Sequence, residues 1–302
     1  MNRGVLLGTG AYLLWGLSPI YWRIEGDVPL FDVILWRTAA AAAMLVCWQT
    51  AAGSLTRLRS LAAEPRARLM FAATSLLLAS NWVTFIWLVG SERVLEVSLG
   101  YFMTPLMNVV LGVVVLRERL RLVPMLTVCA AACGVLVLAL DVGGIPWAAI
   151  YLGGSFAVYG LFRKTSPAGS IDGLTLEMLV LLPFVVFLLV FRALSGDGVF
   201  GLSDVGLDIW LLGAGAMTVA PLLLFAASTR CIELWVVGML QFLAPTIQFF
   251  LGALLWDESW SGGQAVGFVC IWLALIVFVA DTGVQIRRAR RLTSPTAPRP
   301  SA

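Results

Sequence analysis

The sequence predicts an all-α membrane protein whose ten transmembrane helices form two inverted five-helix repeats. Three observations support this fold class: a largely apolar composition, ten apolar runs of membrane-spanning length, and polar and proline residues that recur at a fixed shift along the chain. We expect a first repeat over residues 1–143, a second over 144–282, and a basic disordered tail over 283–302.

The composition indicates that lipid is the solvent for most of the chain. Of its 302 residues, 60% are hydrophobic and 12% are charged, and the mean hydropathy is +0.95. Soluble domains contain about 45–50% apolar and about 25% charged residues. The first apolar run is predicted to be a retained helix, because it contains Trp15 and Tyr21 and no small-residue cleavage site follows.

Ten apolar runs have the length that a membrane-spanning helix needs, about 20 residues. They cover residues 4–22, 31–50, 69–90, 95–116, 123–140, 146–162, 174–192, 209–228, 234–256 and 262–280.

The basic residues predict the orientation of these runs. With the N-terminus in the cytoplasm, 16 Lys and Arg residues fall on the inner side and three on the outer side. Basic residues favour cytoplasmic connections. We therefore expect both termini to be cytoplasmic.

The residue inventory argues against an enzyme. The chain has no histidine, and its five cysteines lie in or beside apolar runs, where packing is the expected role. It has no Walker A pattern for ATP and no clustered acids for intramembrane catalysis. We expect no metal, no cofactor and no nucleic-acid partner.

The repeat is visible when the chain is compared with itself at a shift of 140 residues. Five helices separate equivalent positions, and because five is odd, the second half must enter the membrane from the opposite side. Such inverted repeats are typical of secondary transporters, which bind substrate near the midplane between the halves. A duplicated membrane protein without transport activity is the alternative. The matched pairs are Phe85/Phe225, Phe102/Phe242, Pro105/Pro245, Asn108/Gln248, Gly112/Gly252, Glu118/Glu258 and Asp141/Asp281.

Two of these matches put a proline deep in the membrane. Pro105 and Pro245 each lie about ten residues into their run, roughly 15 Å deep. They remove the backbone hydrogen bonds to the carbonyls of Tyr101 and Gln241. Free carbonyls are tolerated where they are buried in protein or line a wet cavity. We expect the two helices to line the substrate pathway, with a structural kink as the alternative. The polar residues about one turn away are Tyr101, Asn108, Gln241 and Gln248.

Arg37 is a charge inside the second run, and such residues usually face the protein interior. Its equivalent at the 140-residue shift is Glu177, but their depths differ by about 15 Å, which argues against a direct ion pair. We expect Arg37 to meet Glu92 or Glu96, as an anchor for a substrate carboxylate or an outer gate. A snorkelling Arg with a structural partner is the alternative.

Three further side chains are candidates for the pathway. Asn81 and Trp82 lie in the third run, and Tyr159 in the sixth aligns with Trp15 at a shift of 144 residues.

Three segments resemble a known family: "NWVTFIWLV" (81–89), "LGYFMTPLMNVVLGVVVLRERL" (99–120) and "AVYGLFRK" (157–164). They are similar to the RarD family (chloramphenicol-sensitivity protein), in the EamA group of the drug/metabolite transporter superfamily. The resemblance implies ten helices in two inverted halves and a location in the bacterial plasma (inner) membrane. Glu118 and Glu258 match the acidic positions that close the fourth and ninth helices of this group.

These observations predict a secondary transporter that exports a small organic solute by alternating access. A channel-like facilitator and a non-transporting membrane receptor are the alternatives. Because the expected midplane contains no carboxylate, a uniporter, or an exchanger coupled through Glu177, fits better than a multi-group proton relay. The expected partners are the solute and the lipid bilayer, with the protein a monomer or homodimer.

Overall fold

The computed structural model describes residues 3–23, 28–140, 145–199, 205–255 and 262–293, and these residues form only helices, turns and loops. The helices are α1 (Arg3–Trp22), α2 (Leu30–Ala51), α3 (Leu55–Ala63), α4 (Pro65–Gly90), α5 (Val94–Val114), α6 (Leu122–Leu140), α7 (Trp147–Thr165), α8 (Ser170–Leu194), α9 (Val205–Cys231), α10 (Leu234–Gln241), α11 (Leu243–Leu255) and α12 (Gly262–Thr293).

Every expected apolar run coincides with a helix or a helix pair, and the prediction of an all-α membrane protein is confirmed. Among the described residues, 7 segments are long and apolar enough to cross a membrane: α2, α4, α5, α6, α8, α9 and the α10–α11 pair. A shorter apolar stretch, Ala265–Asp281, lies in α12. The runs expected first and sixth coincide with α1 and α7, which are not among these 7 segments of the described residues.

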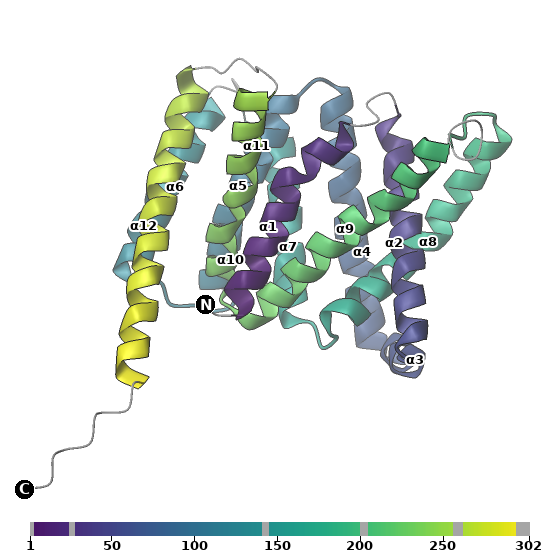
Figure 1. Cartoon of the computed structure of the whole chain (residues 1–302), viewed down its shortest axis with the longest axis horizontal. Helices are drawn as coiled ribbons and strands as arrows, with labels where there is room; N and C mark the ends of the chain where they lie inside the picture. The colour runs from purple at the N-terminus through teal and green to yellow at the C-terminus, as the bar shows by residue number, and fades with distance from the viewer. Residues whose placement is uncertain (1–2, 24–27, 141–144, 200–204, 256–261, 294–302) are drawn as a thin grey trace, which may run out of the picture.

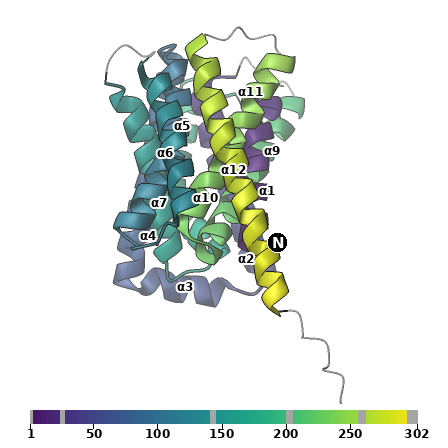
Figure 2. The same ribbon diagram turned by 90° about the vertical axis from the view of Figure 1, so that its left-hand side faces the viewer.

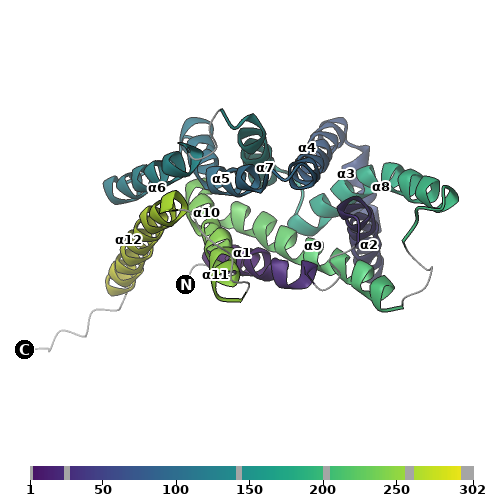
Figure 3. The ribbon, with the colours of Figure 1, turned by 90° about the horizontal axis from the view of Figure 1, so that it is seen from above.

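The long helices stand in two rows (Figure 3). One row contains α6, α5, α7, α4 and α8, and the other contains α12, α10–α11, α1, α9 and α2. The most extensive contacts between the rows are made by three helix pairs: α6 with α12, α5 with α10, and α2 with α8.

The bundle has two distinct ends (Figure 1). We call the end with the start of α1, α3 and the connections 115–121, 166–169 and 232–233 the basic end. The end with residues 23, 28–29, 91–93 and 195–199 is the opposite end. Figure 2 shows α3 lying across the basic end. There Arg57, on α3, pairs with Asp172 at 2.9 Å.

Glycines allow a close contact between the rows at α6 and α12. A Cβ atom added to Gly134 would lie 2.8 Å from the carbonyl oxygen of Gly267, and one added to Gly267 would lie 3.1 Å from that of Gly134. Small residues allow this approach in membranes, where helix association depends on van der Waals packing.

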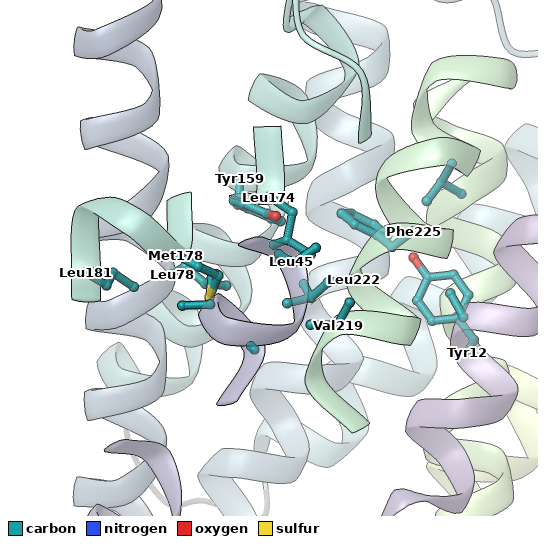
Figure 4. Packing of buried hydrophobic residues seen from close by; sticks show 14 of the residues in the cluster. Tyr12, Leu45, Leu78, Tyr159, Leu174, Met178, Leu181, Val219, Leu222 and Phe225 are labelled. Atoms are coloured by element: carbon teal, nitrogen blue, oxygen red, sulfur yellow. The ribbon is translucent and has the colours of Figure 1, made fainter. Parts of the chain in front are cut away.

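The largest apolar cluster contains residues from helices of both rows (Figure 4). Leu45 of α2, Leu78 of α4 and Met178 of α8 are 2% exposed or less and belong to this cluster. Tyr12 and Phe225 continue the cluster toward α1.

Two expectations about helix boundaries need correction. α12 continues to Thr293, so the first part of the segment expected as a disordered tail is helical; its sequence RRARRL is rich in good helix formers. Residues 294–302 lie outside the described ranges.

The two prolines also differ: the ninth span is interrupted at Phe242, three residues before Pro245, whereas α5 continues through Pro105.

Candidate functional site

A cavity of about 660 Å³ lies between the two rows. Most of the lining residues come from the halves of the helices nearer the opposite end, and Tyr12, Leu222, Gln241 and Ala244 lie close to the middle of their spans. The lining also includes Arg23 and Val28 of the α1–α2 connection, and no described residue of the basic-end connections. The cavity therefore reaches the opposite end and stops near the middle of the bundle.

Seven of the residues proposed from the sequence line this cavity. They are Arg37, Asn81, Trp82, Tyr101, Gln241, Pro245 and Gln248. Six others do not belong to the lining: Glu92, Glu96, Pro105, Asn108, Tyr159 and Glu177.

The amide side chains around the cavity join neighbouring helices. Asn108 donates from Nδ2 to Oε1 of Gln241 at 2.8 Å, which links α5 to α10. Asn81 donates to the carbonyl of Leu152 at 2.8 Å, and Gln248 donates to the carbonyl of Trp15 at 3.1 Å. The amide donors of Asn81, Asn108 and Gln248 are thus already used in helix contacts, whereas Gln241 takes part only through its oxygen.

Arg37 lies on the cavity wall with its guanidinium 4.3 Å from the ring centre of Trp82. Its Nε atom is buried and has no hydrogen-bond partner among the described residues. The prediction that Arg37 meets Glu92 or Glu96 is wrong: Glu96 pairs with Arg93 at 2.5 Å, one helical turn away. Glu92 lies exposed in the α4–α5 turn.

Glu177 is bonded to Arg163 rather than to Arg37, consistent with the depth comparison. It accepts hydrogen bonds from the Tyr159 hydroxyl at 3.0 Å and from Arg163 at 3.4 Å. Glu177 is 0% exposed and Arg163 is 1% exposed. Gly173 provides the space, because a Cβ there would overlap the Arg163 guanidinium. Sequence patterns alone place Arg163 among the charges of a connection, and so they miss this pair.

Aromatic rings close the cavity floor. Tyr12 lines the cavity, and Phe225 lies beneath it, with ring centres 6.3 Å apart. Tyr159 stacks on Phe225 at 6.2 Å. All three side chains are at most 1% exposed.

Below these rings, polar contacts tie the connections of the basic end together. Glu118 accepts hydrogen bonds from the backbone N–H groups of Leu234 (2.8 Å) and Trp235 (3.1 Å), in the first turn of α10. Lys164 lies 3.4 Å from the same carboxylate and donates to the carbonyl of Ile232. The sequence pattern singles out Glu118 but does not indicate these partners. The matched Glu258 lies outside the described residues.

Two further contacts cross the basic end and one crosses the opposite end. Arg230 donates to the carbonyls of Ser166 and Ala168, both at 2.7 Å. Gln49 and Arg57 both donate to Asp172. At the opposite end, Arg192 donates to both carboxylate oxygens of Asp32, at 2.7 and 2.9 Å.

The chain is similar to bacterial membrane proteins along nearly its whole length. Residues 2–140 match the EamA-like transporter family. An uncharacterized transporter of Pseudomonas aeruginosa is 35% identical over 95% of this chain and 97% of its own length. Protein RarD of Escherichia coli is 35% identical over 96% of this chain and 98% of its own length. The uncharacterized transporter YojE of Bacillus subtilis is 35% identical over 96% of this chain and 97% of its own length.

A solved crystal structure shares the fold. It superposes with a TM-score of 0.67 over 96% of this chain and 99% of its own, at 19% sequence identity.

Proposed function

Because this chain belongs to the EamA-like transporter family, we propose that it is a secondary transporter that moves a small organic solute across a bacterial plasma membrane. Transport proceeds by alternating access to the cavity between the two rows. The cavity carries the proposal, because it reaches one end of the bundle and is closed at the other.

The arrangement of the helices supports an inverted repeat of ten spans. Each helix of one row is five spans away along the chain from the helix that faces it in the other row (Figure 3). The facing pairs are α6 with α12, α5 with α10–α11, α7 with α1, α4 with α9 and α8 with α2. The three pairs with the most extensive contacts between the rows are all pairs of equivalent helices.

A matched pair of salt bridges supports the same relation. Asp32 and Asp172 are 140 residues apart, in the first turns of α2 and α8. Asp32 pairs with Arg192 near the end of α8, and Asp172 pairs with Arg57 soon after the end of α2. The two bridges lie at opposite ends of the bundle, as an axis in the membrane plane requires.

The closed end supports alternating access rather than an open pore. Between the cavity and the basic end lie the aromatic floor, the buried Glu177–Arg163 pair and the contacts of Glu118 with α10. A solute that enters at the opposite end cannot continue unless these contacts separate.

We place the basic end in the cytoplasm, because basic residues favour that side. The cavity then faces outward. A C-terminal reporter that works only inside the cytoplasm is expected to be active when fused after Ala302, and one that works only outside is expected to be silent. The reverse result contradicts this orientation.

The transport itself is tested in proteoliposomes with a panel of labelled organic acids, amines and neutral aromatic solutes. A carrier is expected to saturate and to show counterflow, because unlabelled solute inside accelerates entry of labelled solute. Unsaturable flux indicates a channel-like facilitator. Solute binding without flux indicates a receptor.

A further inference from the structure

We propose that the cavity selects a small organic anion: a carboxylate bound to Arg37, with a flat apolar body held among the surrounding aromatic rings. This inference rests on the cavity being the solute site of the proposed function, and it adds the chemical class of the solute.

The charge of the cavity wall is the first argument. Arg37 brings a positive charge to the wall, and none of the described lining residues is an Asp or Glu. Three acids on the lining helices and their neighbours are engaged elsewhere: Asp32 by Arg192, Glu96 by Arg93 and Glu177 by Arg163. A cation that is withdrawn from water without a counterion is costly, and an anionic solute supplies the missing charge.

The geometry of Arg37 is the second argument. The face of the Trp82 ring, 4.3 Å away, holds the guanidinium by a cation–π contact. The Nε atom remains without a partner in the described part of the chain. A guanidinium binds a carboxylate through two parallel N–H···O bonds, which a Lys cannot reproduce.

The remaining polar groups of the wall are few. Asn81 and Gln248 already donate to carbonyls, and Thr104 and Thr218 donate to carbonyls of their own helices. The hydroxyls of Tyr12 and Tyr101 and the Nε2 group of Gln241 line the cavity and make no hydrogen bond with any described residue. Arg37 therefore supplies the charged anchor, and these three groups are free to donate to a carboxylate beside it.

The rest of the wall fits an apolar body. Its aromatic lining residues, besides Tyr12 and Tyr101, are Trp15, Trp22, Trp82, Phe85, Phe156 and Trp210. Trp15 and Phe156 meet edge to face with ring centres 5.6 Å apart, which leaves ring faces available for stacking. A volume of about 660 Å³ suits a small molecule rather than a peptide or lipid.

The same wall disfavours amines and zwitterions. An ammonium group beside Arg37 meets a like charge and finds no carboxylate in the described lining. We therefore expect 3-phenylpropionate to bind better than 3-phenylpropanamide, 3-phenylpropylamine and phenylalanine, which share its ring.

The test is equilibrium binding of these four probes to the purified full-length protein, followed by tryptophan fluorescence. For Arg37→Gln we expect the affinity for 3-phenylpropionate to fall about tenfold or more. For Arg37→Lys we expect an affinity between those of the wild type and Arg37→Gln, because lysine keeps the positive charge but cannot form two parallel hydrogen bonds with the carboxylate. Arg93→Gln is the matched control, since Arg93 bonds Glu96 outside the lining.

The wild-type comparison of the four probes needs no variant, so it holds even if Arg37→Gln folds poorly. The proposal is overturned if the amine, the amide or phenylalanine binds as well as the acid, if the acid does not bind at millimolar concentration, or if folded Arg37→Gln binds it as wild type does. If the acid binds through Arg37 and no counterflow is found, the transport proposal fails while the anion site stands. If a solute shows counterflow that does not need Arg37, the transport proposal stands while the anion site fails.

Discussion

Replacing Glu177 with alanine is expected to destabilise the protein by about 3–5 kcal/mol, because it leaves the buried charge of Arg163 without its partner. Arg163 is 1% exposed, and its other hydrogen bond, to the carbonyl of Ser170 at 2.9 Å, does not neutralise the guanidinium. The substitution also removes the acceptor of the Tyr159 hydroxyl. Thermal unfolding of the purified variant in one detergent measures the effect.

The double variant Arg163→Met with Glu177→Leu is the informative comparison. Replacing both members of a buried ion pair with apolar residues is often neutral or stabilising. We expect it to recover most of the lost stability. If the single variant unfolds at the wild-type temperature, the pair is not the buried contact described here.

The second large effect is expected for Glu118→Ala, which weakens the closure of the basic end. The carboxylate accepts two N–H groups at the start of α10 and faces Lys164. These N–H groups have no partner within their helix and favour a negative charge. An unsatisfied buried donor costs about 1–3 kcal/mol, which corresponds to a shift of about 5- to 150-fold toward the state open at the basic end.

Thiol labelling at residue 228 detects this opening. Ser228 is 0% exposed and donates to the carbonyl of Gly4, inside the closed half. In a protein whose five cysteines are replaced, Ser228→Cys is expected to react from the basic end much faster when Glu118→Ala is added. Glu64→Ala, an exposed acid at the same end, is the control and is expected to leave the rate unchanged. The role of Glu118 is contradicted if Ser228→Cys is labelled at the same rate alone, with Glu118→Ala and with Glu64→Ala.

The sequence was sufficient to predict the features that depend on residue patterns. Apolar runs predicted the helices, and intramembrane polarity predicted that Arg37 and Gln241 share a cavity wall. It did not predict which charges meet, because the rotation and depth of packed helices determine that. Arg163 reaches Glu177 only because Gly173 leaves room on α8, and Lys164 meets Glu118 only because α5 and α7 pack together.

The prolines illustrate the same limit. Equivalent sequence positions predicted two similar irregularities, yet Phe242 interrupts the ninth span and α5 remains a continuous helix. Gly238 brings α10 close to α5 at this level, where an added Cβ would lie 2.6 Å from the carbonyl oxygen of Pro105. The local packing of the two helices therefore differs although their prolines are equivalent.

The central claim is that one cavity is reached from the two membrane faces in turn, and Ala244 offers the most direct measurement of it. Ala244 lines the cavity and is 9% exposed. With the native cysteines replaced, Ala244→Cys is labelled with an impermeant thiol reagent in right-side-out and inside-out vesicles, with and without transported solute. We predict labelling from the outer face at rest, and labelling from the cytoplasmic face only when solute drives the protein through its cycle. Labelling from both faces at rest, or none from the cytoplasmic face during turnover, contradicts alternating access.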